Sequence, residues 1–476
     1  MFSSVATKRP LVAVIGTTGV GKSRVAIDVA LACNGEVINA DAMQVYRGLD
    51  TITNKVTDEE MKGVPHHLMG FKEPGEESFV TEWLTMALET IESIHKRNKL
   101  PIVVGGTSYW LQNLLFPNRI VTETNSAISK TRAKPDPQLQ VALDHLDDDS
   151  LALFNNLPER PPTAGDDSEQ TMRLWKLLDA LDPEMAGRWH WKDSRKVLRN
   201  LEIIAEKGQK ASEVIKGQDK DPLESRYRTM VLWPFSEDDI LYPRLDKRVD
   251  QMIKSGLLEE IKTLQKISSN HGDSTSTSVD YSSGIYQSIG FKEFHDYLSS
   301  PSEEAFSVSV ESMKRATQKY AKYQTKWIRS KFLPLAQAAP DTHTYVLDTS
   351  NADQWGLIEE NAITLTNSFL NNTPLPPPSN ITPLADRLLL SSTLSKPSAA
   401  LSLQRKIPCK LCSTDPSDPF LVNEAEWNEH LNTKGHQRMV KSLKNREQYM
   451  EYLRRKELGS HGSQNTGTMG SNADMV

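Results

Sequence analysis

Short strand-like runs of apolar residues dominate the first hundred positions of the chain. The first occupies residues 11–15, and similar runs follow at 36–39 and 101–104. Between the last two, residues 80–96 carry apolar side chains three and four positions apart, which is the spacing of one helix face. Buried strands that alternate with helices are typical of a parallel sheet with helices on both faces. The pattern therefore predicts an α/β fold built on a doubly wound parallel sheet.

The middle of the chain is more polar and more helical. From Pro117 to about Asp182 prolines interrupt the sequence, and helical periodicity appears around 139–153 and 171–181. We interpret residues 118–185 as a helical insertion, and we expect the core to occupy 1–117 and 186–370. Further helices are predicted at 193–207, 241–266 and 303–331.

The composition changes again after residue 370. Residues 371–405 are rich in proline and then in serine, leucine and threonine, which predicts a disordered linker. A small cysteine and histidine module is expected at 406–440. Residues 441–476 read as a basic helix followed by a disordered tail.

A glycine-rich motif follows the first strand directly. Residues 16–23 read G-T-T-G-V-G-K-S, the spacing of a P-loop, and a helix-compatible run follows at 24–32. The glycines allow positive φ, so successive backbone N–H groups can point into one concavity that holds phosphate. Lys22 adds a positive charge, and the Ser23 hydroxyl can hold Mg²⁺. The alternative is a chance match on a glycine-rich turn, which the preceding strand and following helix disfavour.

The position of the acidic residue argues against NTP hydrolysis. A motor or ATPase is expected to place an aspartate after a second apolar strand, but residues 102–104 are followed by Gly105-Gly106-Thr107. Asp41 instead follows the strand at 37–39, on the same rim of the sheet as the loop. A carboxylate there can take a proton from a nucleophile that attacks a phosphate-bearing substrate. Its alternative role is an N-cap for a following helix.

The motifs resemble, in order, those of the tRNA dimethylallyltransferases, also called tRNA isopentenyltransferases. After the P-loop, the matching segments are 35–46 (GEVINADAMQVY), 53–55 (TNK), 63–67 (GVPHH), 103–107 (VVGGT), 193–199 (DSRKVLR), 245–250 (LDKRVD) and 287–294 (QSIGFKEF). The resemblance covers about residues 11–370 and, with the C-terminal module, indicates the eukaryotic branch. The chain departs from the family pattern at Ala42, at Trp191-Lys192, and at Gln318-Lys319 with Tyr323.

This resemblance implies transfer of a dimethylallyl group from its diphosphate to N6 of the adenosine just 3′ of the anticodon. Asp41 would then be the general base, and the catalytic residues Thr18, Lys22 and Arg248 would stabilise the leaving diphosphate, with Mg²⁺ at Ser23. Arg248 could alternatively be a solvated helix charge. The other implied diphosphate-binding residues are Gly16, Thr17, Gly19, Val20, Gly21 and Ser23. The resemblance also implies that the insertion at 118–185 binds tRNA. The implied tRNA-binding residues are Ala42, Met43, Gln44, Thr107, Arg195, Lys196, Val197, Leu198 and Arg199.

The helix predicted at 303–331 has a basic side. Its basic residues fall on one face, and an adjacent face, which we expect to pack, carries Ala316, Tyr320, Tyr323 and Trp327. The basic residues are Arg315, Lys319, Lys322, Lys326 and Arg329. The resemblance favours an RNA-facing role, and the alternative is a solvated amphipathic helix.

The C-terminal module has the ligand pattern of a zinc finger. Cys409-x₂-Cys412 is followed by seventeen residues and then His430-x₅-His436, which predicts a structural Zn²⁺ site. So small a module is not expected to fold without its metal. Residues 438–456 hold seven basic and two acidic side chains, a net of +5 that suits a phosphate backbone. The alternative is a finger that binds protein.

Bulk composition limits the remaining choices. The formal net charge of −6 and 25% charged residues describe an ordinary water-soluble protein, and no apolar run is long enough to span a membrane. Three cysteines indicate a reducing compartment, so we expect a cytoplasmic location, with mitochondrion and nucleus as alternatives. We also expect a monomer. The expected partners are tRNA and dimethylallyl diphosphate. The competing functions are a P-loop kinase of nucleotides or metabolites and a nucleic-acid-binding regulator with a vestigial loop.

Overall fold

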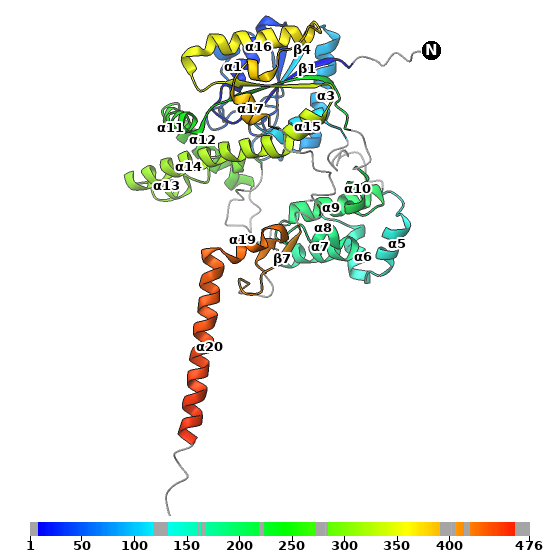
Figure 1. Ribbon diagram of the computed structural model, residues 1–476, viewed down its shortest axis with the longest axis vertical. Coiled ribbons are helices and arrows are strands. Elements are labelled where there is room, and N and C mark those ends of the chain that lie inside the picture. Colours follow the sequence, from blue (N-terminus) through cyan, green and yellow to red (C-terminus); the bar gives the residue numbers. More distant parts are fainter. Residues whose placement is uncertain are drawn as a thin grey trace, which may run out of the picture. The chain divides into compact units, whose positions relative to one another are not determined.

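Figure 1 shows a computed structural model of the chain. The structure describes residues 8–117, 132–159, 161–162, 165, 167–218, 223–271, 281, 284–390, 401, 405–413 and 419–461. The chain divides into two compact units, one from residues 1–131 and 217–396 and the other from 132–216 and 397–476. None of the described helices combines the length and the apolar character that a membrane crossing needs.

The first unit is built on a six-stranded parallel sheet with the order β3-β2-β4-β1-β5-β6. Its strands are β1 (Pro10–Val14), β2 (Gly35–Asn39), β3 (His66–His67), β4 (Leu100–Val104), β5 (Arg228–Phe235) and β6 (Thr342–Asp348). The expected parallel sheet is confirmed, and β1, β2 and β4 fall on the three predicted runs. Strands β3, β5 and β6 were not expected from the sequence.

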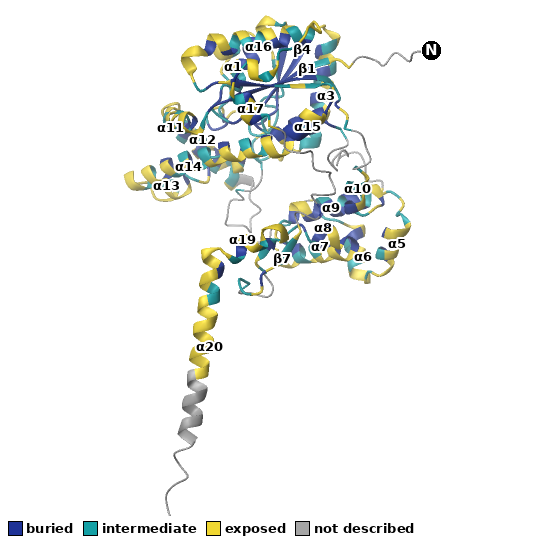
Figure 2. Ribbon diagram, in the orientation of Figure 1, coloured by how far each residue is buried: buried dark blue, intermediate teal, exposed yellow. Residues whose placement is uncertain are grey.

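Helices cover both faces of this sheet, as the α/β prediction requires. In the central strand β1, Leu11 and Ala13 belong to the apolar cluster on the face of helices α3 and α4, whereas Val12 and Val14 belong to the cluster on the face of α1 and α16. Successive strand side chains point to opposite faces, so a strand that is buried on both sides must be apolar throughout. Figure 2 shows the resulting buried sheet between more exposed helices.

The helices of the first unit follow the predicted periodicity closely where predictions exist. They are α1 (Lys22–Ala32), α2 (Asp58–Met61), α3 (Val80–Lys96), α4 (Ser108–Leu115), α11 (Asp238–Lys254), α12 (Leu257–His271), η1 (Gly284–Gln287), α13 (His295–Ser299), α14 (Glu303–Trp327), η2 (Ile328–Phe332), α15 (Leu333–Ala338), η3 (Ala352–Gln354), α16 (Trp355–Leu370), η4 (Pro378–Asn380) and α17 (Leu384–Leu388). The helix predicted at 80–96 has those bounds, and the one at 241–266 is broken between α11 and α12 at Ser255-Gly256.

Helix α14 packs only partly through the face expected: Trp327 lies against the main apolar cluster, but two of the other residues do not pack. Its buried positions include Val310, Met313 and Ala321, and the polar Gln324 lies with them at 4% exposure. Tyr320 and Tyr323, which we expected to pack, are 37% and 62% exposed. The expectation was wrong because it treated the tyrosines as the apolar face, whereas the amide of Gln324 occupies a packing position by satisfying both its polar ends with hydrogen bonds described below.

The second unit combines a helical bundle with the C-terminal module. Its elements are α5 (Pro137–Asp144), α6 (Asp148–Asn155), α7 (Ser168–Leu181), α8 (Pro183–Ala186), α9 (Ser194–Lys207), α10 (Ala211–Gly217), β7 (Lys406–Pro408), β8 (Leu421–Asn423), η5 (Glu424–Glu426), α19 (Trp427–Leu431) and α20 (Lys434–His461). Residues 186–216, which the sequence placed with the core, lie in this unit. The Lys406 N–H donates to the Gly187 carbonyl over 2.7 Å, which joins the module to the bundle.

Part of the expected linker is packed against the first unit. Ala385 and Leu388 on α17 are 2% and 3% exposed, and the Tyr345 hydroxyl donates to the Pro376 carbonyl over 2.6 Å. Residues 372–390 therefore form structure where disorder was predicted, because α17 carries apolar side chains that the sheet can bury. Residues 391–400 and 402–404 of the expected linker, and the expected tail from 462, lie outside the described residues.

A buried carboxylate on β2 joins two strands and the turn between α3 and β4. Glu36 is 3% exposed, and its oxygens lie 2.7 Å from His67 Nε2, 2.5 Å from Arg97 Nη2 and 2.8 Å from Lys99 Nζ. Burial alone would raise the pKa of this carboxyl, but the hydrogen bonds from Lys99, His67 and Arg97 outweigh it and lower the pKa to about 2. Glu36 is thus a structural anion.

Replacing Glu36 with glutamine should destabilise the protein in a pH-dependent way. The shift from an ordinary pKa of 4.5 to about 2 corresponds to roughly 3 kcal/mol. Because the folded-state pKa is depressed, this contribution is complete above about pH 4.5 and disappears as the pH falls toward 2. Urea denaturation should show a large difference between the Glu36→Gln variant and the unmodified protein at pH 7 that narrows below pH 4.5. Glu92→Gln, which breaks an exposed pair with Arg9, is the control and should change little. A difference that stays constant with pH would contradict this account.

Candidate active site and metal centre

The glycine-rich loop leaves β1 and ends at the first residue of α1. Gly21 has φ +83° and directly precedes Lys22, so it takes a left-handed conformation that favours glycine. A Cβ on Gly21 would lie 2.6 Å from Cη2 of Trp355, whose indole closes the outer side of the loop. The Lys22 ammonium folds back and donates to the Thr17 carbonyl over 2.7 Å. The structure thus builds the P-loop that the spacing predicts.

Asp41 lies at the carboxyl end of β2, on the rim that carries the P-loop. No helix follows it among the described residues 42–57, so the N-cap alternative does not apply. One carboxylate oxygen, Oδ1, accepts the Met43 N–H over 3.0 Å, and the Asp41 N–H is held by Asn39 Oδ1 over 3.0 Å. The other oxygen, Oδ2, faces Gly106, at 3.2 Å from the point where a Cβ on that residue would be. The turn fixes one oxygen and directs the other toward the end of β4.

Three groups at this rim are electrostatically coupled. The pKa of Lys22 is lowered to about 8. Burial is the main cause, the negative charge of Asp41 opposes it, and the positive charge of Arg248 adds to it. Burial likewise lowers the pKa of Arg248 on α11 to about 10 against the influence of Asp41. The charge of Glu60 also acts on Arg248. Two buried cations whose charge is disfavoured by burial suit an anionic ligand.

The ends of β2 and β4 are in direct backbone contact. A Cβ on Gly105 would lie 2.1 Å from the Ala40 carbonyl oxygen, so only glycine fits there. The Thr107 N–H donates to the Ala40 carbonyl over 3.3 Å, and the Thr107 hydroxyl accepts the Ala42 N–H over 3.0 Å. Thr107 and Ala42 are therefore neighbours, as they must be if both contact the same part of a tRNA.

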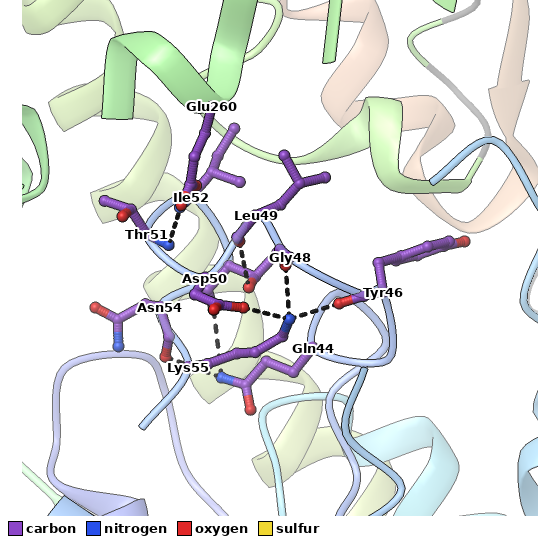
Figure 3. Close-up of polar contacts among 11 residues, drawn as sticks. Gln44, Tyr46, Gly48, Leu49, Asp50, Thr51, Ile52, Asn54, Lys55 and Glu260 are labelled. Carbon is purple, nitrogen blue, oxygen red and sulfur yellow. Dashed lines mark hydrogen bonds and ion pairs between the residues drawn. The ribbon is translucent and has the colours of Figure 1, made fainter. Parts of the chain in front are cut away.

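The loop after Asp41 is held by a buried lysine, as Figure 3 shows. Lys55 Nζ donates to the Tyr46 and Gly48 carbonyls and to Asp50 Oδ1 over 2.5–2.7 Å, which uses all three ammonium protons. Within this loop the Gln44 amide donates to the carbonyls of Thr53 and Asn54 over 3.3 and 3.1 Å.

A carboxylate from α12 fixes the far end of the same loop. Glu260 accepts the N–H groups of Thr51 and Ile52, each over 2.8 Å, with one oxygen apiece. A surface loop rarely has this many charge-assisted bonds to its backbone, and the segment that presents Ala42, Met43 and Gln44 is consequently rigid.

Gln324 of α14 is a site residue that sequence reasoning missed. Its carbonyl oxygen accepts the Thr18 N–H over 2.9 Å, and its NH₂ donates to the Gly106 carbonyl over 3.0 Å. Tyr320 lies one turn earlier on the same helix, and burial of its hydroxyl raises its pKa, which the negative charge of Asp41 raises further. The sequence carries no local signal for this role, because both partners of the amide lie more than 200 residues away.

Comparisons with known proteins place this site in a family. Residues 44–331 match the family model described as IPP transferase, and residues 10–70 match the one described as isopentenyl transferase. The chain is 36% identical to the tRNA dimethylallyltransferase of Schizosaccharomyces pombe over 95% of its own length and 99% of the relative's. The chain belongs to the tRNA dimethylallyltransferase family.

Other family members are similar to this chain over most of their length. The tRNA dimethylallyltransferase of Mus musculus is 32% identical over 92% of this chain and 88% of its own. A solved structure of a eukaryotic dimethylallyltransferase acting on tRNA superposes with a TM-score of 0.75 at 30% identity, covering 94% of this chain and all of the other. The family resemblance that the sequence motifs suggested is confirmed, as is the eukaryotic character of the match.

In this family member, the second group of expected tRNA-binding residues lies on α9 of the second unit. Arg195 and Lys196 are exposed, Lys196 covers the ring of Trp189 at 4.7 Å, and Arg199 is paired with Glu202 over 2.8 Å. Val197 and Leu198, also expected to bind tRNA, are 0% and 3% exposed and pack inside the bundle. Only their neighbours therefore present side chains at the surface.

The four predicted zinc ligands come together in the C-terminal module. Cys409 follows β7, Cys412 lies in the turn after it, His430 is on α19, and His436 is on α20. Their sulfur and nitrogen atoms all lie within 4.8 Å of one another. The sequence prediction of this Cys₂His₂ group is thus confirmed as a group that could hold a metal.

The spacing of these atoms fits one tetrahedral zinc ion. Cys412 Sγ lies 3.6 Å from His430 Nε2 and 3.4 Å from His436 Nδ1, and the two histidine nitrogens are 3.1 Å apart. Bonds of about 2.3 Å to sulfur and 2.0 Å to nitrogen around one centre produce separations of this size. Phe420 stacks on the His430 ring at 5.5 Å between centroids, which fixes the ligand's orientation. The donor set and geometry fit Zn²⁺.

Proposed function

We propose that this protein transfers the dimethylallyl group of dimethylallyl diphosphate to N6 of the adenosine adjacent, on the 3′ side, to the anticodon of tRNA. As a tRNA dimethylallyltransferase family member it is a prenyl-transferring enzyme, and its activity on tRNA follows from the relatives' shared activity. The observation that supports the residue roles is the convergence of the P-loop, the two cations Lys22 and Arg248, and the Asp41 carboxylate on one rim of the sheet.

The arrangement suits displacement of a diphosphate by a weak nucleophile. The N6 nitrogen forms a bond to C1 of the dimethylallyl group, the carbon that carries the diphosphate. The bond from C1 to the diphosphate oxygen breaks, and diphosphate leaves with the electron pair. The proton from N6 passes to Asp41 Oδ2, which the turn at Met43 directs into the site. Lys22 and Arg248 stabilise the charge that develops on the leaving group, so they bind the transition state more tightly than the ground state.

The rest of the P-loop completes the diphosphate site. Thr18 supplies a hydroxyl, and the backbone of residues 16–21 and the N-terminus of α1 supply partial positive charge. Ser23, in the first turn of α1, is the residue that would hold Mg²⁺. Bound there, Mg²⁺ would neutralise phosphate oxygens. Ala42, Met43, Gln44 and Thr107 would contact the acceptor nucleoside, which must leave its stack to reach Asp41.

One assay separates this function from its rivals. The protein is incubated with unmodified tRNA and radiolabelled dimethylallyl diphosphate, or with ATP and nucleotide or metabolite acceptors. We expect label in the tRNA and no ATP-dependent phosphoryl transfer. ATP turnover without label transfer would favour the kinase, which the family membership and the RNA-type finger already disfavour. Neither activity would favour a binding protein with a vestigial loop.

The low pKa of Lys22 predicts how diphosphate binding depends on pH. Because burial lowers the pKa to about 8, the unliganded enzyme loses this positive charge as the pH rises through 8. We expect kcat/KM for dimethylallyl diphosphate to fall above pH 8, by up to about tenfold per pH unit, mainly through KM. A Lys22→Arg variant stays protonated and should lack the decline, even if its overall rate is lower. A flat profile to pH 9.5 in the unmodified enzyme would contradict a phosphate-binding role for the Lys22 ammonium.

A further inference from the structure

The Gln324 side chain spans two loops that are far apart in the sequence. It is 4% exposed, its carbonyl accepts the Thr18 N–H, and its NH₂ donates to the Gly106 carbonyl. Thr18 belongs to the loop that would hold the leaving diphosphate. Gly106 lies beside Asp41 Oδ2 and directly precedes Thr107. One side chain therefore bonds both the leaving-group loop and the strand end beside the base.

The lack of a side chain at Gly106 leaves room for the Gln324 amide. A Cβ at that position would lie 2.6 Å from Gln324 Nε2 and 3.2 Å from Asp41 Oδ2. The glutamine NH₂ and the carboxylate oxygen therefore border the same small space on the Cα of Gly106. The two hydrogen bonds, from the Thr18 N–H and to the Gly106 carbonyl, engage both ends of the amide. The amide is thus held in one orientation, with its acceptor toward the P-loop and its donor toward β4.

We propose that Gln324 is a positioning residue that sets the distance between the diphosphate loop and the general base. The inference rests on the proposed function, since it concerns the same reaction. It also has a consequence for the loop itself. The Thr18 N–H, which in a simple phosphate cradle would point at the ligand, is committed to Gln324, so leaving-group contacts fall to the other N–H groups of the loop and to Lys22.

Only a glutamine satisfies both loops. The Thr18 N–H needs an acceptor and the Gly106 carbonyl needs a donor, and both ends are buried, so an unpaired group would be costly. Methionine has nearly the same shape but neither function at its end, and glutamate can accept but not donate when ionised. A shift of about 1 Å between leaving group and base can cost on the order of 100-fold in rate. Loss of the amide should therefore reduce kcat more than substrate binding.

The test is a double-mutant cycle of Gln324→Met and Asp41→Asn, assayed as label transfer to tRNA. We expect Gln324→Met to lower kcat by about 10- to 100-fold with tRNA affinity unchanged, but to cost less than about threefold when Asp41 is already asparagine. Positioning the base has no value once the base is gone. A purely structural residue would cost the same factor in both backgrounds, and that result would overturn the proposal.

Two further variants keep the test interpretable. Gln337→Met removes a glutamine whose NH₂ bonds the Leu389 carbonyl over 2.6 Å, away from the site, and should transfer at the normal rate. If Gln324→Met melts below the assay temperature, Gln324→Glu replaces it. That variant keeps an acceptor for the Thr18 N–H, loses the donor to Gly106 and adds a negative charge near Asp41, so a loss of kcat at least as large is expected. If the unmodified enzyme transfers label and both Gln324 variants match it, the inference fails while the proposed function stands. If the unmodified enzyme transfers no label, the proposed function itself fails.

Discussion

An Asp41→Asn enzyme is expected to lose prenyl transfer by about 10²- to 10⁴-fold while binding tRNA within a few-fold of the unmodified protein. Asparagine keeps a side-chain oxygen that can accept the Met43 N–H, so the turn after β2 persists. What it lacks is the ability to accept a proton from N6 and the negative charge beside Lys22 and Arg248. Single-turnover transfer and filter binding with unmodified tRNA measure the two quantities separately.

The comparison of two substitutions identifies which role of Asp41 matters. Asp41→Ala removes both the base and the turn acceptor, so its extra effect beyond Asp41→Asn reports the structural contribution alone. We expect that extra effect to be small in rate and modest in thermal stability. If Asp41→Asn transferred normally and only Asp41→Ala failed, Asp41 would be a turn residue and another group would have to take the proton. A large loss of tRNA binding in Asp41→Asn would also argue against a base.

Replacing Cys412 with serine should remove the metal of the C-terminal module and unfold it. The module has a two-stranded sheet of three residues per strand and few buried side chains, so zinc binding supplies its folding free energy. We expect the zinc content to fall from one equivalent to none. We further expect tRNA affinity to fall by at least about tenfold, because the basic stretch at 438–456, with a net charge of +5, would no longer be held in place. Transfer at saturating tRNA should be nearly unchanged.

Cys33→Ser provides the matched control. Cys33 lies at the end of α1, outside the module, where its thiol contacts Asn367. It should retain zinc, tRNA affinity and transfer. If Cys412→Ser lost its zinc and kept full tRNA affinity, the module would not contribute to RNA binding and a protein partner would become the better explanation. If the zinc content were unchanged, the four side chains would not be the metal ligands.

The parts of the site that lie within one strand-loop-helix unit could be predicted from sequence. Lys22 ends the loop after the buried strand β1, and Asp41 lies two residues after the buried strand β2. Parallel strands bring their carboxyl ends to one rim, so the motif spacing and the topology together placed both residues. The zinc ligands were predictable for the same local reason, since two thiols and two imidazoles at that spacing have few other uses. The predicted helix at 80–96 was correct because its apolar face repeats over several turns.

What sequence reasoning missed depends on contacts between distant segments. Gln324 is 306 and 218 residues away from the two loops it joins, and nothing local distinguishes it from a solvent-facing glutamine on a charged helix. Strand β6 begins with three polar residues and continues with three apolar ones, so it has no clear strand pattern of its own, and its pairing with β5 over residues 342–348 gives it a definite strand conformation. Tyr320 and Tyr323 were expected to pack because aromatic residues are usually buried, but they lie at the surface beside the site.

The contact between Gly105 and Ala40 separates two branches of P-loop chemistry. In a hydrolase the residue after the strand next to the P-loop strand carries the acid that organises the attacking water. Here that residue is Gly105, and any side chain there would collide with the backbone of the residue before Asp41, 2.1 Å from its Cβ. An acid could be gained at position 105 only by displacing the turn that aims Asp41. The close contact between the two strand ends therefore excludes a hydrolase-type acid at position 105 as long as the turn at Asp41 is kept.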